Sequence, residues 1–235
     1  MGLHEAAAVL GTHAPAEVTF TSVSTDTRTL GAGALFVALR GPRHDGHAHL
    51  SAARAAGAVA AVVDRAVADP LAQLQVPDTL AALHALARAW RGRFARPLIG
   101  VTGSNGKTTV KEMLAAILGR RGPVLATRGN RNNAIGLPLT LLELRAPHTA
   151  AVIEMGMNAP GEIAVLADLA RPDAGLITNA GPAHLEGLGT VEAVARAKGE
   201  LIEGLAPGAT AILNADDAHL PLWRALAGAR RVLTF

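Results

Sequence analysis

Hydrophobic runs alternate with helix-like stretches through the second part of the chain. Because regular alternation of strand and helix is typical of a parallel sheet with helices on both faces, we expect a mostly parallel α/β domain here. Ligands of such sheets bind beyond the carboxyl ends of the strands, so polar residues that directly follow the runs are candidates for a site. The runs occupy residues 98–102, 124–127, 150–154, 174–178, 210–214 and 231–235.

The first part of the chain has shorter strand-like runs between turns. Apolar runs at 33–41 and 59–63 predict two strands, and a helix predicted at 79–94 follows a stretch with two prolines. We therefore predict a small α/β N-terminal domain at residues 1–78 and a P-loop, mostly parallel-sheet domain at residues 79–235.

Composition and charge narrow the class of protein. The 235 residues include no cysteine, which excludes disulfide bonds and thiolate metal sites. No apolar run reaches transmembrane length, and the first residues lack the basic start and long apolar stretch of a secretory signal. The net charge of +3 comes without a dense basic stripe. We expect a soluble cytoplasmic monomer that binds neither nucleic acid nor a membrane.

Lysine is scarce in this chain. Of the 22 basic side chains, only Lys107, Lys111 and Lys198 are lysines, so the other 19 are arginines. Arginine and lysine differ where a compact charge or a nucleophilic amine is needed, so each lysine calls for a chemical explanation. We interpret Lys111 as a solvated helix residue.

The segment "GVTGSNGKTTVKEM", residues 100–113, places a glycine-rich turn between a predicted strand and a predicted helix. Such turns bind phosphates through backbone N–H groups, with a lysine on the outer phosphates and a hydroxyl facing Mg²⁺. The strict pattern requires glycine at position 101, where this chain has Val101, so the turn is a variant. The residues predicted to bind ATP here are Gly103, Ser104, Asn105, Gly106, Lys107, Thr108 and Thr109.

Polar residues follow two further runs at the same predicted edge. Glu154 ends one run, and Asn179 and then His184 follow another. Mg²⁺ prefers hard oxygen ligands, which favours Glu154 as its carboxylate partner, although strand-end glutamates often cap helices instead. His184 would be an unusual magnesium ligand, and a polar loop histidine is the alternative.

Lys198 lies in a predicted helix and has two interpretations. It can be a surface lysine paired with Glu200 or Glu203. Alternatively, its amine can react with CO₂ to give a carboxylate-like metal ligand, for which a guanidinium cannot substitute. The preference for arginine elsewhere supports the second interpretation, and the sequence leaves both open.

Several segments together resemble the Mur ligase family, and within it the ligases that add D-alanyl-D-alanine. They occur in the family's order and spacing over nearly the whole chain, and they read "GVTGSNGKTTVKEM", "GNRNNAIGLPLTLLEL", "VIEMGMNAPGEI", "ITNAGPAHLEGLGT", "ARAKGELI" and "LNADD". Sister ligases for earlier steps usually carry a serine pair after the strand-end glutamate and "DHLD" at the histidine, where this chain has "EMG" and "AHLE".

The resemblance implies an ATP-dependent amide ligase of peptidoglycan synthesis. Such an enzyme joins D-alanyl-D-alanine to UDP-N-acetylmuramoyl-tripeptide through an acyl phosphate, with ATP and Mg²⁺. It implies that Lys107 acts on the β- and γ-phosphates and that Thr108 and Glu154 hold one Mg²⁺. A second Mg²⁺ would lie on His184 and carbamylated Lys198. The family's catalytic set would thus comprise Lys107, Glu154, His184 and Lys198, with Asn214 on the adenine side.

The resemblance also assigns substrate-binding residues. In the first domain these fall on the segment "VSTDTR" and on the loop that follows the second strand, and Asn132 and Asn133 would face the nucleotide site. They are Ser24, Thr25, Asp26, Thr27, Arg28, Asp45, Gly46, Asn132 and Asn133. An ion pair between Arg28 and Asp26 is the alternative for that arginine. For His44, His47 and His49, we favour a solvated loop over a metal site.

The resemblance implies a C-terminal ligase domain, which we expect to lie outside these 235 residues. We therefore expect the chain to bind the UDP-tripeptide, with nucleotide binding as a further possibility, and to turn over poorly or not at all. Alternative hypotheses are a sister ligase, including a folylpolyglutamate synthase, and a UDP-peptide-binding module without turnover. A simple ATP hydrolase is the weakest, because it leaves the first domain unexplained.

Overall fold

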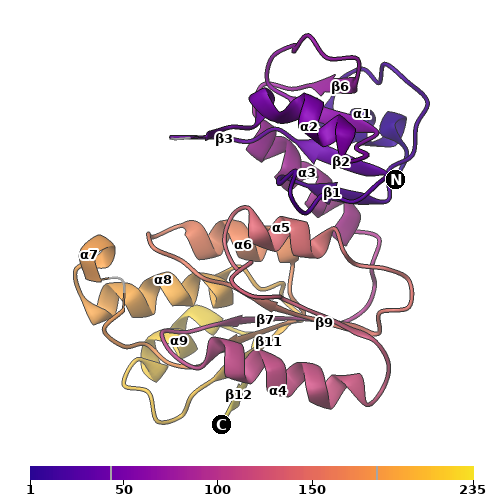
Figure 1. The fold of residues 1–235 in the computed structure, drawn as a ribbon. Coiled ribbons are helices and arrows are strands. Elements are labelled where there is room, and N and C mark those ends of the chain that lie inside the picture. The colour runs from indigo at the N-terminus through magenta and orange to yellow at the C-terminus, as the bar shows by residue number, and fades with distance from the viewer. Residues whose placement is uncertain (43, 184) are drawn as a thin grey trace. The chain divides into compact units, whose positions relative to one another are not determined.

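The computed structural model describes residues 1–42, 44–183 and 185–235, which form two compact units. The first unit spans Met1–Gly92 and the second spans Arg93–Phe235 (Figure 1). This division differs from the boundary predicted at residues 78 and 79. The helix that begins at Thr79 packs on other elements of the first unit, and its first hydroxyl donates a hydrogen bond to the carbonyl of Ala38 at 3.1 Å.

The first unit is built on a four-stranded parallel sheet in the order β1-β2-β5-β6. Every residue of the two central strands is buried, as is expected for parallel strands covered on both faces. A short antiparallel hairpin follows β2. The strands are β1 (Ser22–Ser24), β2 (Ala34–Val37), β3 (Arg40–Gly41), β4 (His44–Asp45), β5 (Ala60–Val63) and β6 (Ala72–Gln75).

Helices surround this sheet and follow local sequence signals. Asp78 caps the N-terminus of α3 by accepting hydrogen bonds from the N–H groups of Leu80 and Ala81. Leu83 and Leu86 lie on its buried face, which packs towards α1 and β5. The helical segments are α1 (Leu3–Leu10), the 3₁₀ segment η1 (Gly46–His49), α2 (Leu50–Ala55) and α3 (Thr79–Arg91).

The second unit contains a six-stranded parallel sheet in the order β12-β11-β10-β7-β9-β8. The chain begins this sheet at its middle with β7, places β8 and β9 on one side, and then crosses to β10 on the other. Such a reversal of strand order opens a crevice at the carboxyl end of the central strand. The strands are β7 (Leu98–Thr102), β8 (Val124–Ala126), β9 (Ala150–Glu154), β10 (Ala174–Ile177), β11 (Thr210–Leu213) and β12 (Arg231–Thr234).

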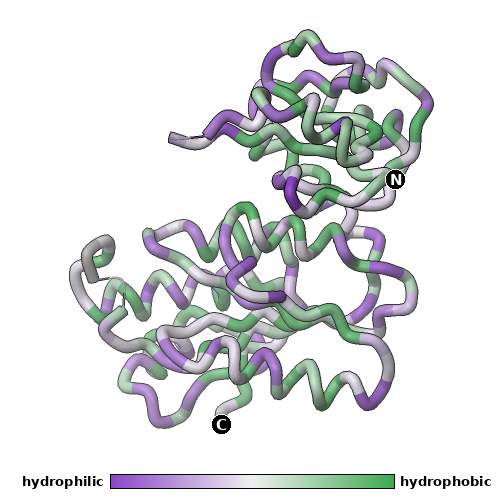
Figure 2. The backbone as a smooth tube through the Cα atoms, in the orientation of Figure 1, coloured by the Kyte–Doolittle hydropathy of each residue, from purple (hydrophilic) through white to green (hydrophobic). Residues whose placement is uncertain are grey.

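The two faces of this sheet are covered unequally. α4 lies against β7, β8 and β9 on one face, while α6, α8 and α9 pack together on the other (Figure 1). The strands form the hydrophobic stretches between these layers (Figure 2). The helices are α4 (Lys107–Gly119), α5 (Gly136–Leu141), α6 (Glu162–Ala170), α7 (Leu185–Leu188), α8 (Val191–Glu203) and α9 (Leu220–Ala227).

The unequal cover is visible in the burial of one row of paired residues on the α4 face of the sheet. Val101, Leu176, Ile212 and Leu233 are neighbours across β7, β10, β11 and β12, so their side chains share one face. Val101 is fully buried and Leu176 is 6% exposed, whereas Ile212 is partly buried and Leu233 is 43% exposed. Cover on this face therefore decreases towards β12.

The mixed α/β fold with mostly parallel sheets agrees with the prediction from the hydrophobic pattern. Each of the six predicted runs coincides with a strand of the second sheet. Among the described residues, no helix combines the length and the apolar character that a membrane span needs.

Candidate nucleotide and metal site

The glycine turn joins β7, the central strand of the sheet, to α4. Gly103 has φ of 151°, and a Cβ added there would lie 1.8 Å from Oγ1 of Thr178. Both the backbone conformation and the lack of space therefore require glycine. Gly106 has φ of 79° and forms the N-cap of α4, with nothing close to the position of a Cβ.

The end of β10 holds the turn in shape. Ser104 N–H donates to the carbonyl of Asn179 at 2.9 Å, and Asn105 N–H donates to its side-chain oxygen at 3.0 Å. The hydroxyl of Thr178 donates to the carbonyl of Asn105 at 2.6 Å. In the described part of the chain, the first N–H groups of α4 form no hydrogen bond, so they are available to a phosphate at the helix N-terminus.

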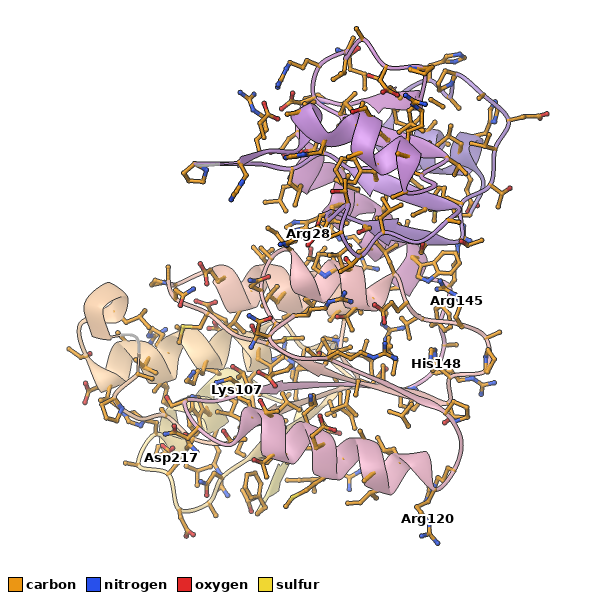
Figure 3. All side chains as sticks on the ribbon, viewed as in Figure 1. Arg28, Lys107, Arg120, Arg145, His148 and Asp217 are labelled. Carbon is orange, nitrogen blue, oxygen red and sulfur yellow. The ribbon has the colours of Figure 1, made fainter. Side chains whose placement is uncertain are left out.

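Lys107 places its ammonium group within the turn. Its Nζ donates to the carbonyls of Gly103 at 2.7 Å and Ser104 at 3.3 Å, and Figure 3 shows the residue at the start of α4. Burial lowers the pKa of Lys107, and the charge of Glu154 opposes that shift. A compact cation inside a turn of backbone N–H groups is suited to the charge of a polyphosphate.

Glu154 ends β9 beside this turn and accepts two side-chain hydrogen bonds. The hydroxyl of Thr108 donates to its Oε2 at 2.9 Å, and the amide of Asn132 donates to its Oε1 at 2.8 Å. The glutamate is 3% exposed. A Cβ on Gly156 would lie 2.9 Å from the Asn132 side chain, so glycine makes room for that amide.

This donor set fits a magnesium ion. Mg²⁺ binds oxygen ligands at 2.0–2.1 Å in octahedral geometry, so two adjacent ligands lie about 2.9 Å apart. That separation matches the distance between Thr108 Oγ1 and Glu154 Oε2. A hydroxyl and a carboxylate could thus bind one ion without moving apart.

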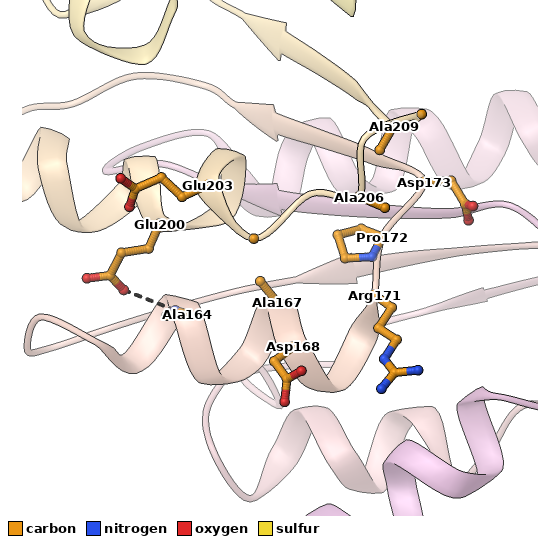
Figure 4. Close-up of a pocket in the computed structure, with 12 residues that line it drawn as sticks. Ala164, Ala167, Asp168, Arg171, Pro172, Asp173, Glu200, Glu203, Ala206 and Ala209 are labelled. Carbon is orange, nitrogen blue, oxygen red and sulfur yellow. Dashed lines mark hydrogen bonds between the residues drawn. The ribbon is translucent and has the colours of Figure 1, made fainter. Parts of the chain in front are cut away.

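Lys198 is buried in α8, where it is 2% exposed. Burial and then the nearby charge of Lys107 lower its pKa to about 8. No hydrogen bond or ion pair joins its ammonium to the described residues. The surface interpretation of Lys198 is therefore wrong, and Glu200 instead accepts hydrogen bonds from the N–H groups of Gly161 and Ala164 at the start of α6 (Figure 4).

The remaining predicted residues of this unit differ in their roles. Asn132 reaches Glu154, whereas the side-chain oxygen of Asn133 accepts hydrogen bonds from the N–H groups at 135 and 136, just before and at the start of α5. The side chain of Asn214 donates to the carbonyl of Thr178 at 3.0 Å and so ties β11 to β10. Thr109 follows Thr108 in α4 and is exposed. His184 lies outside the described residues.

In the first unit, the predicted segment 24–28 forms a turn after β1 that is closed by its own side chains. Ser24 and Asp26 exchange hydrogen bonds, and Arg28 pairs with the Asp26 carboxylate at 2.6 Å. The hydrogen bond from the Arg28 side chain, followed by that from its backbone N–H, lowers the pKa of Asp26 to about 2. The Arg28 side chain is 86% exposed, and the ion pair considered for it is present. Thr25 and Thr27 are half-buried members of the same turn.

The predicted solvated histidine loop is only partly solvated. His44 and His49 are exposed, but His47 is 4% exposed. Its Nε2 accepts a hydrogen bond from the N–H of Asp64 at 3.0 Å, and its Nδ1 lies 2.6 Å from a carboxylate oxygen of Asp45. An imidazole that accepts at Nε2 can donate at Nδ1, so both ring nitrogens are satisfied within the protein.

Asp45 and Gly46 are fixed by this arrangement. The Asp45 carboxylate caps η1 and contacts Arg65, whose side-chain hydrogen bond is the main cause of its lowered pKa. A Cβ on Gly46 would lie 2.8 Å from the backbone of Ala38, so only glycine allows the loop to approach β2. Among the described residues, no group of three or more His, Asp or Glu side chains is arranged to hold a metal ion.

A cavity of about 700 Å³ lies at the opposite end of the strands, between α6 and α8 (Figure 4). Its charged lining residues are Asp168, Arg171, Asp173, Glu200 and Glu203. Carboxylates outnumber the single arginine, so this cavity is unsuited to phosphates. The glycine turn remains the candidate nucleotide site.

Sequence reasoning missed three residues that shape the site. Lys111 was interpreted as solvated, but it is 1% exposed. Thr127 and Thr178 were not identified, although both are buried and both hydrogen-bond to site residues. The scarcity of lysine was a usable signal for Lys111, whereas no pattern in the sequence distinguishes these two threonines.

Two domain families match this chain. The Mur ligase middle domain matches residues 101–235, and the Mur ligase family catalytic domain matches residues 19–91. These ranges fall within the two compact units.

Among curated proteins, the chain is similar to the UDP-N-acetylmuramoyl-tripeptide–D-alanyl-D-alanine ligases of Synechocystis and Escherichia coli. It is 51% identical to the first over 87% of this chain and 46% of the relative. It is 47% identical to the second over 94% of this chain and 49% of the relative. The chain thus spans about half the length of the curated relatives it matches.

Solved structures agree with this similarity. A crystal structure of MurF from Acinetobacter baumannii superimposes with a TM-score of 0.93 at 36% identity, covering 99% of this chain and 52% of that protein. The MurF ligase from Thermotoga maritima, solved in complex with ADP, gives 0.81 at 35% identity, covering 91% and 50%. The chain belongs to the Mur ligase family.

Proposed function

We propose that this chain carries the UDP-substrate and ATP-binding parts of an enzyme that joins D-alanyl-D-alanine to UDP-N-acetylmuramoyl-tripeptide. The observation that carries the proposal is the Thr108–Glu154 pair, which lies beside Lys107 at the carboxyl end of the central strand. The relatives named for this reaction, and a related MurF solved with ADP, support it. The cytoplasm, where ATP is available, is the proposed location.

The proposed reaction makes an amide from a carboxylate and an amine. An oxygen of the tripeptide carboxylate attacks the γ-phosphorus of ATP, the bond to the ADP oxygen breaks, and an acyl phosphate forms. The amine of D-alanyl-D-alanine then attacks the acyl carbon and loses a proton, and the tetrahedral intermediate expels phosphate. Activation is needed because a carboxylate is a weak electrophile with a poor leaving group.

In this proposal the turn residues bind and orient the triphosphate. The N–H groups at the start of α4 contact phosphate oxygens, and the Lys107 ammonium moves from the turn carbonyls to the β- and γ-phosphates. Thr108 and Glu154 would hold Mg²⁺, which neutralises phosphate charge when bound. Asn132 keeps the Glu154 carboxylate oriented through its hydrogen bond. Asn214 is proposed for the adenine side.

Lys198 is proposed to act as a carbamate. Its lowered pKa leaves about half of the amine neutral near pH 8. The neutral nitrogen attacks the carbon of CO₂ and loses a proton, which converts a cation into an anion with two hard oxygens. Together with His184, these oxygens would hold a second Mg²⁺. The burial of the amine without a carboxylate partner supports this role, because carbamylation removes a desolvated positive charge.

Carbamylation can be tested with ¹³C-labelled bicarbonate. NMR of the 235-residue chain should show a carbamate carbon signal that grows between pH 7 and 8.5 and is absent from Lys198→Arg. A signal that persists in Lys198→Arg would assign it to another amine. Absence of the signal from the parent chain would reject the carbamate.

The UDP-substrate is proposed to bind the first unit through the turn at 24–28 and through the loop at Asp45 and Gly46. The self-paired side chains of these segments support binding by backbone groups and by the exposed Arg28 guanidinium. A sister ligase would prefer another acid substrate. Titration with UDP-N-acetylmuramoyl-tripeptide, the corresponding dipeptide and a folate separates these cases, and we expect the tripeptide to bind most tightly.

The decisive experiment for the nucleotide site is calorimetry of Lys107→Ala. We expect this variant to lose Mg²⁺-ADP binding by at least about ten-fold, because the charge-assisted contact to the β-phosphate is removed. Binding of UDP-N-acetylmuramoyl-tripeptide should stay within about three-fold of the parent. Unchanged Mg²⁺-ADP binding would contradict the proposal, whereas loss of both ligands together would indicate misfolding.

A further inference from the structure

Lys111 is a buried cation to which the proposed reaction assigns no role. It is 1% exposed and is the one residue of α4 that is buried, although apolar residues of this helix also face the sheet. Its Nζ donates to the carbonyl of Thr127 at 2.6 Å and lies 2.8 Å from the carboxylate of the exposed Glu112. Burying an ammonium group costs free energy, so a lysine at this position needs an explanation.

The contacts of Lys111 belong to a closed ring of contacts, here called the circuit, that joins Lys111, Thr127, Glu154 and Thr108. Thr127, whose carbonyl accepts from Lys111, also accepts from the N–H of Glu154 through its hydroxyl at 2.9 Å. Glu154 in turn accepts from the hydroxyl of Thr108 at 2.9 Å. Thr108 and Lys111 are three residues apart in α4, so the helix itself closes the circuit.

We propose that Lys111 is a positioning residue that sets the separation between the Thr108 hydroxyl and the Glu154 carboxylate. α4 supplies one of these oxygens and β9 the other, and Lys111 ties α4 to the residue that holds the backbone of Glu154. The inference rests on the proposed function, because the two oxygens matter as a pair only when they bind one Mg²⁺ with the nucleotide. The expected consequence is a stronger effect on metal-dependent binding than on binding of the nucleotide alone.

The chemistry of the position favours lysine over arginine. Within the protein, the ammonium meets one backbone carbonyl at 2.6 Å, and its second partner is at the surface. A compact ammonium fits a single acceptor, whereas a planar guanidinium needs space and acceptors for several N–H groups. This explains why a chain with 19 arginines retains a lysine here.

Calorimetry of ADP with and without Mg²⁺ tests the proposal. In Lys111→Met, which keeps an unbranched apolar side chain but removes the ammonium, the factor by which Mg²⁺ tightens ADP binding should fall at least about ten-fold. Binding of ADP in EDTA should stay within about three-fold of the parent. Lys111→Arg keeps the charge and should recover part of the Mg²⁺ effect.

Glu112→Gln is the matched control. It removes the negative charge of the exposed partner of Lys111 but leaves the hydrogen bond to Thr127, so the Mg²⁺ effect should equal that of the parent. Thr127→Val removes the hydroxyl that accepts from the N–H of Glu154. It should therefore reduce the Mg²⁺ effect by the same factor as Lys111→Met. If Lys111→Met does not fold, the Mg²⁺ effect measured for Thr127→Val tests the proposal in its place.

Two results overturn the inference. Equal losses with and without Mg²⁺ would show that Lys111 merely anchors the helix, and an unchanged Mg²⁺ effect would show that it has no part in metal binding. Either result leaves the proposed function intact, provided that Mg²⁺ tightens ADP binding to the parent chain. A parent chain that shows no Mg²⁺ effect would instead contradict the proposed function.

Discussion

The two parallel sheets of this chain differ in how charged side chains are paired at the carboxyl ends of their strands. In the first unit, arginines and aspartates pair with each other near the protein surface, as Arg28 does with Asp26 and Arg65 does with Asp45 and Asp64. In the second unit, the lysines are wholly or partly buried: Lys107 and Lys111 donate to backbone carbonyls, Lys111 also pairs with the exposed Glu112, and Lys198 has no partner among the described residues. The charges at the first edge are paired with each other, whereas at the second edge Lys107 and Lys198 form no ion pair with the described residues.

This difference explains the uneven use of lysine and arginine. Surface ion pairs tolerate the larger, well-solvated guanidinium at little cost, so arginine fills them throughout the chain. Buried and half-buried positions favour a compact charge or an amine that can lose its proton. Lys107, Lys111 and Lys198 occupy such positions, and each is on an element that borders the glycine turn or Glu154.

The largest loss of stability is expected at Gly103, where the turn after β7 has no space for a side chain. Gly103→Ala must adopt φ of 151° and place a Cβ 1.8 Å from Oγ1 of Thr178. We expect backbone strain and overpacking together to destabilise the fold by about 4 kcal/mol or more, with loss of detectable Mg²⁺-ADP binding. Urea unfolding and calorimetry measure the two quantities.

Two glycines nearby provide matched controls for Gly103. Gly106→Ala meets no neighbouring atom but keeps a positive φ of 79°, so a cost of about 1 kcal/mol is expected. Gly119→Ala, at the end of α4, meets no neighbour and has ordinary helical geometry, so it should be neutral or slightly stabilising. Equal costs at all three positions would show that the turn is not the constrained element.

A smaller effect is expected from removing the buried charge at Lys198. The folded-state pKa of about 8 lies below the unfolded value of 10.5, so the unfolded chain binds more protons between these two values. Stability of the parent should therefore rise with pH across this window, while the burial cost is fully present below pH 8. Lys198→Met lacks this cost and should be more stable at pH 7 by on the order of 3 kcal/mol.

Urea unfolding at pH 7, 8.5 and 10 measures this difference, which should shrink as pH rises. The control is Arg196→Met, which removes an exposed cation from the same helix and should shift stability equally at each pH. A constant advantage of Lys198→Met at every pH would mean that packing, and not charge, explains it. Unfolding in CO₂-free buffer excludes a contribution from carbamylation.

The smallest effect is expected in the first sheet. Asp26→Asn should cost less than about 1 kcal/mol, because its partner Arg28 is largely solvated. The pKa of Asp26 is lowered to about 2, so its contribution is present above the unfolded value of 3.8 and is lost as pH falls through 2. Thermal unfolding at pH 7 and pH 2 tests this, and a large loss at pH 7 would show that the two edges are not so different.

Local sequence patterns predicted most of the second sheet and its glycine turn. Each hydrophobic run became a strand because buried parallel strands need continuous apolar residues, and Gly103, Lys107, Thr108 and Glu154 met because they follow neighbouring strands. The strand-end rule thus located both the turn and its carboxylate partner.

Features that depend on packing between distant segments were not predictable. The scarcity of lysine singles out Lys111, but the helical pattern does not show that its ammonium is buried and donates to the carbonyl of Thr127, 16 residues away in the chain. His47 is buried because Asp64 reaches its ring from β5's end. The unit boundary after Gly92 likewise depends on where α3 packs, since its amphipathic pattern does not specify a partner.

The uneven cover of the second sheet bears on how this chain behaves at high concentration. Within residues 1–235, β12 is an edge strand, and Leu233 and Phe235 at its end are exposed, as are Met113 and Ile117 on α4. Unpaired backbone N–H and C=O groups of an edge strand, next to exposed apolar side chains, favour strand-to-strand association between molecules. Arg231 is the single charge on that edge strand, so replacing it with a neutral residue should promote self-association and lower solubility.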